Sequence, residues 1–485
     1  MPGKIFGFVL VVLFVSGVIG AAPAAAQRPQ LSTYVKQFVV TDAPVVALTH
    51  ARVIDGSGAP AKADQTLIVR DGRIEEVGSA ASVKVPNDAR VFDLTGKSVI
   101  PGLVMMHEHL YYPTVAPGSG PQVYANLSES FVRLYLAGGV TSMRTGGNMN
   151  GFAEIAMKQA IDRGERAGPW MDATAPYLEG PGLNFLQVHT LTDAADARRL
   201  IDYWHDQGAS SLKAYMHITR DELKASIEEG HRLGMRITGH LCSVTYGEAA
   251  RLGIDNLEHG FFAATDFAPD KAPDVCPTMG GTGRAALVAL APGSDSIRAL
   301  IRELVQHHVA LTSTLTVFET GTPGRPMPPG LDVLDPILRE NFVQYKANVD
   351  RNTTSPNAVL FPKARQWEID FYRAGGLLLA GTDPTGGGGV IPGYSDQREL
   401  ELLVEGGLTP LEAIKVCTLN GATFLGRANL VGSIAAGKQA DLVVIDGDPS
   451  TRIEDVRRVS IVFKDGVGYD PGKLIASVRG RVGLF

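Results

Sequence analysis

The sequence predicts an α/β protein in which a (β/α)8 TIM barrel carries a small β-sandwich domain built from both ends of the chain. Segments with strand and helix periodicity alternate through residues 101–430, which is typical of a parallel barrel. Short strands separated by Gly-containing turns fill residues 27–100 and 431–485. The 485 residues are enough for one large barrel and one smaller domain.

The barrel prediction depends on repeated pairs of one strand and one helix. The apolar strand "SVIPGLVMMHEH" opens the series, and the strands "SLKAYM", "MRITGH" and "GLLLAGTDP" each follow a segment with helical spacing. One segment departs from this alternation. Residues 318–365 are rich in Pro, and we expect an irregular insertion on the loop side that acts as a lid.

The two ends of the chain share one sequence pattern, short strands separated by turns. "ALTHARVIDGSG" and "TLIVRDGRIEEVG" near the N-terminus are half-buried strands with Gly or Asp-Gly turns. "ADLVVIDGDP" and "RVSIVFKDGVGYD" near the C-terminus have the same pattern. The simplest arrangement is one β-sandwich domain formed by both flanks of the barrel.

Residues 1–26 have the features of a signal peptide. Lys4 supplies the positive start, Ile5–Gly20 is an apolar run, and Ala24-Pro-Ala26 provides a cleavage site. The alternative is an uncleaved anchor, but the run is short for a membrane span. We expect cleavage after Ala26, a periplasmic or secreted protein, and no stable membrane span after cleavage.

Composition and charge exclude a nucleic-acid partner. The net charge of −6 is mild, and no basic stripe is present. Hydrophobic residues at 45% and charged residues at 20% are ordinary for a globular enzyme with a small-molecule substrate. Both a monomer and a homo-oligomer are compatible with the sequence.

The chain has three cysteines, Cys242, Cys276 and Cys417. An odd number in an exported chain does not predict a disulfide framework. We expect all three to be small buried hydrophobic residues. Cys242 has an alternative, since it lies two residues after a candidate metal ligand and could face the pocket.

Residues suited to metal binding fall where the predicted strands end. His107 and His109 stand at positions i and i+2, so both imidazoles point to one face. The others lie at or near strand ends, where barrel enzymes place their active sites: Lys213, His240, His259 and Asp383. Each one alone has an ordinary structural explanation, but six on five strand ends predict a metal centre.

This pattern resembles the amidohydrolase superfamily, in particular its exported, prolidase-like dipeptidases and its imidazolonepropionase-like branch. The matching segments occur in order along nearly all of the mature chain. They are "IPGLVMMHEHL", "GVTSMRTGG", "GASSLKAY", "GHLCS", "IDNLEHG", "LLLAGTDP", "LTPLEAIKVCTLNGATFLG" and "GSIAAGKQADLVVID".

The resemblance implies a binuclear centre with two divalent ions. His107, His109 and Asp383 would hold the deeper ion, and His240 and His259 the second. Zinc is the expected metal for such a set of nitrogen and oxygen ligands.

The resemblance further implies that Lys213 is carboxylated and bridges both ions, because a carbamate is an anion whereas an ammonium would be repelled. A hydroxide between the metals would attack the scissile carbonyl. Asp383 would take the hydroxide proton and deliver it to the leaving amine.

Two further residues are candidate substrate contacts. Tyr215 is two residues after Lys213 and so shares its face, where the resemblance implies that a Tyr bonds the substrate oxygen; otherwise it is a packed aromatic. Arg144 ends the second strand and either binds a substrate carboxylate or forms an internal ion pair. Relatives often have a Gly-Gly-His where Asn184 stands and a His where Gln397 stands, which puts their usual substrate contacts in doubt.

We therefore expect an exported binuclear amidohydrolase that cleaves an amide bond of a dipeptide or an N-acyl amino acid. Alternatives are a mononuclear deaminase or cyclic-amide hydrolase, which lack the bridging lysine and often carry a Glu where Ser243 stands, and a lactone or ester hydrolase. A non-catalytic binding protein on the same barrel is disfavoured by the complete ligand set. One barrel hosts many chemistries, so the fold does not choose the substrate.

Overall fold

The structure, a computed structural model, describes residue 3 and residues 29–114, 123–183, 187–277, 282–385 and 388–483. The expected signal peptide, apart from residue 3, and Asn184 lie outside the described residues. Within them, no helix has both the length and the apolar character needed to cross a membrane.

The described chain contains a three-stranded and a five-stranded parallel set, eight barrel strands in all. The strands are β7 (Leu103–Glu108), β10 (Val140–Thr145), β11 (Trp170–Asp172), β12 (Ser211–Ala214), β13 (Arg236–Gly239), β14 (Asn256–Leu257), β15 (Ala310–Ser313) and β16 (Leu378–Ala380).

Two contacts close these sets into a barrel. A parallel bridge between Thr174 and Ser211 joins the end of β11 to β12. On the opposite side, the amides of Thr382 and Asp383 donate to the carbonyl of His107 at 3.1 and 3.0 Å, which joins the end of β16 to β7. The predicted (β/α)8 barrel is confirmed, and the bonds that join β16 to β7 lie at the candidate ligands His107 and Asp383.

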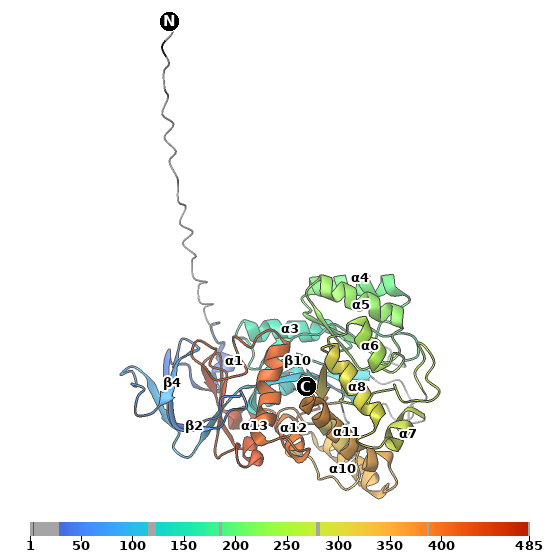
Figure 1. Ribbon diagram of the computed structural model, residues 1–485. Coiled ribbons are helices and arrows are strands. Elements are labelled where there is room, and N and C mark those ends of the chain that lie inside the picture. The colour runs from blue at the N-terminus through green and yellow to red at the C-terminus, as the bar shows by residue number, and fades with distance from the viewer. Residues whose placement is uncertain are drawn as a thin grey trace.

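Helices surround the barrel, and most strands are followed by one (Figure 1). They are α2 (Ser128–Ala137), α3 (Gly151–Asp162), α4 (Ala194–Gln207), α5 (Arg220–Arg232), α6 (Tyr246–Leu252), α8 (Asp295–Gln306), α11 (Pro356–Arg373), α12 (Tyr394–Glu405), α13 (Pro410–Lys415) and α14 (Gly421–Phe424), with the π-helix η2 (Val416–Asn420). Capping boxes of Thr219 with Glu222 and of Thr245 with Glu248 start α5 and α6. These caps set where the loops after β12 and β13 end.

Residues 318–365 are mostly helical, so the expectation of an irregular insertion is wrong. They contain the end of α9 (Leu315–Thr320), the short helix η1 (Leu331–Val333), α10 (Pro336–Arg351) and the start of α11. The prolines explain the difference, because Pro336 and Pro356 each occupy the first turn of a helix, where a missing N–H costs nothing.

Both ends of the chain contribute to one nine-stranded sheet beside the barrel (Figure 1). Its strands are β1 (Val39–Thr41), β2 (Val45–Val53), β3 (Lys62–Arg70), β4 (Arg73–Ser79), β5 (Arg90–Asp93), β6 (Ser98–Pro101), β17 (Leu442–Ile445), β18 (Val459–Lys464) and β19 (Val467–Tyr469). The two ends meet where β6 pairs with β17 and where β1 pairs with β19, both antiparallel.

Buried side chains line both faces of the β2–β3 pair: Val46 and Leu48 pack on one face, and Val45 and Ala47 on the other. The remaining elements are the hairpin β8 (Tyr111–Thr114) with β9 (Val123–Asn126), and α1 (Thr33–Lys36), α7 (Thr282–Ala289), η3 (Ile453–Arg457) and α15 (Pro471–Ala476).

Cys242 and Cys276 form a disulfide bond, with Cα atoms 4.9 Å apart. The expectation of unpaired cysteines is therefore wrong for these two, and only Cys417 is free and buried. The two partners lie 34 residues apart, on the loops after β13 and β14. Whether the two cysteines pair depends on how those loops pack, and the number of cysteines in the chain does not predict this.

Candidate metal centre

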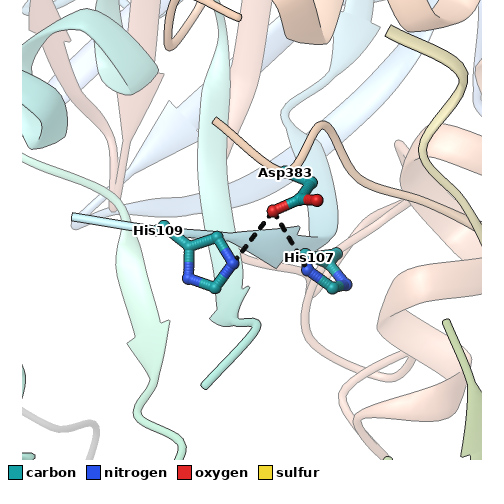
Figure 2. A group of neighbouring side chains, drawn as sticks. All are labelled: His107, His109 and Asp383. Carbon is teal, nitrogen blue, oxygen red and sulfur yellow. Dashed lines mark ion pairs between the residues drawn. The ribbon is translucent and has the colours of Figure 1, made fainter. Parts of the chain in front are cut away.

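His107, His109 and Asp383 converge at the mouth of the barrel (Figure 2). One ligand atom from each lies within 4.8 Å of the others. Asp383 Oδ1 is 3.1 Å from His109 Nε2 and 3.6 Å from His107 Nε2. Two imidazoles and a carboxylate in this arrangement can hold a divalent metal ion.

Small residues make room for His107. An added Cβ would come within 2.5 Å of the His107 ring at Gly146 and within 2.5 Å of its Cβ and amide at Gly381. Gly146 follows β10 and Gly381 follows β16, the two neighbours of β7. The imidazole is therefore enclosed by backbone on both sides, which holds it in one place.

Hydrogen bonds occupy the Nδ1 atoms of three histidines. His107 Nδ1 lies 2.7 Å from Glu258 Oε2, His109 Nδ1 lies 2.9 Å from the Gly147 carbonyl, and His259 Nδ1 lies 2.9 Å from Thr314 Oγ1. Because the carboxylate and the carbonyl only accept, Nδ1 is the donor in the first two rings, and their Nε2 atoms face Asp383. Metal-binding histidines are oriented in this way.

His240 and His259 complete a cluster of four imidazoles. Their ring centroids are 4.3 Å apart, and His259 lies 4.7 Å from the His107 ring. Burial lowers the pKa of His240 to about 3 and the pKa of His259 well below its usual range. Both rings are therefore neutral at pH 7, the form that binds metals.

His259 and Asp383 have a left-handed backbone, with φ values of 67° and 55°. This conformation costs a residue other than Gly about 1–3 kcal/mol and is common at functional sites. Each follows a short strand, β14 or β16, and the backbone reversal places the two side chains 3.8 Å apart, from Nδ1 to Oδ2.

Lys213 brings a buried amine beneath the histidines. Its side chain is 1% exposed, and Nζ has no hydrogen-bond partner among the described residues. Lys213 Nζ forms a long ion pair with Glu258 Oε1, at 3.9 Å. Burial lowers the pKa of Lys213 to about 8, since a charged ammonium is poorly solvated there.

Glu258 is a site residue that the sequence analysis missed. Its Oε2 binds His107, while its Oε1 accepts from Arg144 Nη2 at 2.7 Å and from Thr238 Oγ1. Burial alone would raise the pKa of this carboxyl, but His107, Lys213 and Arg144 hold it well below its usual range. The sequence did offer one indication of this role, because Glu258 directly precedes the candidate ligand His259 in "NLEHG".

Arg144 forms the internal ion pair that was one of its two predicted roles. It is 1% exposed, its Nη2 also donates to Asn256 Oδ1 at 2.6 Å, and its Nε donates to the Met106 carbonyl at 2.9 Å. These contacts bury the guanidinium against Glu258, Asn256 and the Met106 carbonyl.

We expect Arg144→Met to lower stability rather than to weaken substrate binding. Removal of one partner leaves the Glu258 carboxylate buried and uncompensated, which costs about 3–5 kcal/mol. Urea unfolding measures the loss, and Arg339→Met on exposed α10 is the control. An increase in KM at unchanged stability would restore the substrate role.

Comparison with known proteins agrees with this geometry. The family model described as "Amidohydrolase family" matches residues 98–468. The chain belongs to the Amidohydrolase family. This amidohydrolase is therefore an enzyme that hydrolyses carbon–nitrogen bonds of the amide type, and its family generally uses divalent metals.

Three relatives illustrate the similarity. An imidazolonepropionase of Porphyromonas gingivalis (strain ATCC BAA-308 / W83) is 24% identical over 412 residues, which is 82% of this chain and 86% of the relative. An ochratoxinase of Aspergillus niger is 35% identical over 258 residues, 52% of this chain and 42% of the relative. The solved structure of a Xaa-Pro dipeptidase with bound methionine shares the fold, with a TM-score of 0.66, 18% identity and coverage of 88% and 100%.

Aromatic residues line two sides of the centre in this amidohydrolase. Tyr215 lies 5.1 Å from the His240 ring and stacks on Tyr177 at 4.3 Å. On the other side, the edge of Phe318 meets the His259 ring at 5.9 Å. Tyr215 therefore lies beside the His240 ring, and Phe318 lies beside the His259 ring.

Gln397 lies away from the centre. Its side chain is buried on α12 and donates to the Gly138 carbonyl at 3.2 Å. Gln397 therefore packs against the segment between α2 and β10.

Proposed function

We propose that this amidohydrolase is an exported binuclear metalloenzyme that cleaves the amide bond of a small substrate such as a dipeptide or an N-acyl amino acid. The observation that carries the proposal is Lys213, a buried amine without a hydrogen-bond partner among the described residues, beside four imidazoles and Asp383. The histidines and Asp383 alone could hold a single ion, whereas an anionic group on Lys213 would favour a second ion beside it.

The residues present fit two ions. His107, His109 and Asp383 would hold one, and His240 and His259 the other. Zinc is the expected metal because the donors are imidazole nitrogens and carboxylate oxygens.

Carboxylation of Lys213 would supply the bridge. Reaction with CO2 requires the neutral amine, and the lowered pKa of Lys213 makes this form accessible near pH 8. The amine adds to CO2 and releases one proton, and the negative charge of the carbamate would remove the repulsion between an ammonium and two cations. It would also give a hydrogen-bonding group to a nitrogen that has no partner among the described residues.

When bound, the metals polarise the scissile carbonyl and lower the pKa of the attacking water. Asp383 is placed to accept the water proton and to pass it to the leaving amine. Burial would raise its pKa, but hydrogen bonds with His107 and His109 hold the pKa well below its usual range, so Asp383 is a carboxylate before it accepts. The Tyr215 hydroxyl would stabilise the carbonyl oxygen.

Export is supported by two independent features. Residues 1–26 have the composition of a signal peptide. The Cys242–Cys276 disulfide is the kind of bond that persists in oxidising compartments such as the periplasm or the extracellular space.

A hydrolysis screen of the metal-loaded mature protein tests the proposed function. Its library contains Xaa-Pro, Xaa-Arg and Xaa-hydrophobic dipeptides, N-acyl amino acids and lactones, and metal content is measured on the same sample. We expect release of free amines and two ions per chain. Cleavage of lactones alone would contradict the amide assignment, and one tightly held ion would favour a mononuclear deaminase.

A further inference from the structure

Arg284 is a cation at the active-site end of the barrel that the proposed mechanism does not use. It lies in the first turn of α7, on the segment after β14. Its Nη1 donates a hydrogen bond to Asn357 Oδ1 at 2.6 Å. Lys363 Nζ, 2.5 Å from the Val288 carbonyl, anchors the other end of α7, so the helix is held in place on α11.

The charge of Arg284 is not balanced. No ion pair joins it to a carboxylate in the part of the chain that the structure describes, and α7 has no acidic residue in its first turn. Its side chain is half-buried, and burial lowers its pKa. A half-buried cation at the positive end of a helix is unfavourable unless an anion joins it.

Contacts connect Arg284 to the metal centre. Asn357, which accepts from Arg284, donates through Nδ2 to the Gly321 carbonyl at 2.9 Å. Gly321 ends α9, and Phe318 of that helix meets His259 edge-on at 5.9 Å and stacks on Phe262 at 3.7 Å. Arg284 is therefore linked through Asn357 to α9, the helix that places Phe318 against His259.

We propose that Arg284 binds a carboxylate of the substrate, at a subsite on the Phe318 side of the metal centre. This inference rests on the proposed amidase function. It names the substrate class: an amide with an acidic group several bonds away from the carbonyl that is attacked, such as a dipeptide with a Glu side chain. A guanidinium recognises a carboxylate through paired hydrogen bonds, and no neutral isostere replaces that interaction.

Matched dipeptides that differ only in one charge test the subsite. The metal-loaded enzyme is assayed with Ala-Glu against Ala-Gln and with Glu-Ala against Gln-Ala. We expect kcat/KM to favour Glu over Gln by about 10-fold to 100-fold at one of the two positions. Arg284→Met should abolish the preference and leave the Gln substrate within about twofold, while Arg284→Lys keeps part of it. Arg302→Met, on the exposed side of α8, should change neither rate.

Equal rates for Glu and Gln at both positions, or a preference that survives in Arg284→Met, would overturn the subsite. If no dipeptide is cleaved, the proposed function fails separately, and a binding measurement still decides the subsite. Calorimetric titration of the metal-loaded protein with N-acetylglutamate and with N-acetylglutamine should show tighter binding of the acid, lost in Arg284→Met. Equal affinities would contradict the proposal.

Discussion

Lys213→Ala should reduce turnover by at least the ~10²–10³-fold that loss of one catalytic donor costs, and it should lower the bound metal from two ions towards one or none. The buried amine lies 3.9 Å from Glu258 Oε1, without a hydrogen bond to the described residues, so alanine removes the proposed bridge and leaves no group in its place. Steady-state rates and elemental analysis measure the two effects. Lys224→Ala, on the exposed face of α5, is the matched control.

Chemical rescue separates a bridging role from a role in folding. Added propionate should restore part of the activity of Lys213→Ala, because a small carboxylate can enter the vacated space and stand in for a carbamate. Full activity of Lys213→Ala without an additive would exclude the binuclear mechanism.

The same residue makes activation depend on pH. An amine with a pKa of about 8 is mostly charged at pH 7 and mostly neutral at pH 9. Metal-free protein should therefore regain activity with zinc faster at pH 9 than at pH 7, by about tenfold at equal dissolved CO2. A rate that does not change with CO2 would mean that Lys213 stays a free amine.

Asp383→Asn should cause the largest loss of activity, on the order of 10³–10⁵-fold in kcat, as for other single catalytic residues. The substitution preserves shape but removes the charge that faces His107, His109 and His259. It also removes the group that we propose accepts and returns a proton. Stopped-time assays and metal analysis measure the outcome, and Asp206→Asn at the exposed end of α4 is the control.

The pattern of loss distinguishes two roles of Asp383. If the carboxylate only holds a metal, saturating zinc should restore the activity of Asp383→Asn. If it also moves a proton, activity should stay low in the metal-saturated variant. Unchanged kcat without added zinc would remove Asp383 from the mechanism.

Local sequence patterns were sufficient for the barrel and for the position of its candidate ligands. A strand that ends in His107 or Asp383 can be recognised from a few apolar residues, because strand and helix periodicity depend on neighbours along the chain. Parallel strands in a closed barrel must bring their carboxyl ends to one face. The six residues were therefore predictable as a group before any contact was known.

Contacts between distant segments were not predictable in this way. The partners of Arg144 and the role of Glu258 depend on which side chains meet inside the barrel, across strands more than 100 residues apart. The pairing of Cys242 with Cys276 depends on how two loops pack. Neither the number nor the spacing of these residues carries that information.

The order of residues alone predicts a barrel with six candidate ligands at one face: His107, His109, Lys213, His240, His259 and Asp383. Contacts in space were needed to show that Lys213 lacks a hydrogen-bond partner among the described residues, that Glu258 neutralises Arg144, and that no described carboxylate pairs with Arg284. The physical reason is that a residue type sets what a side chain can do. Its burial and its neighbours in space set whether its charge is already satisfied or is left for a metal or a substrate.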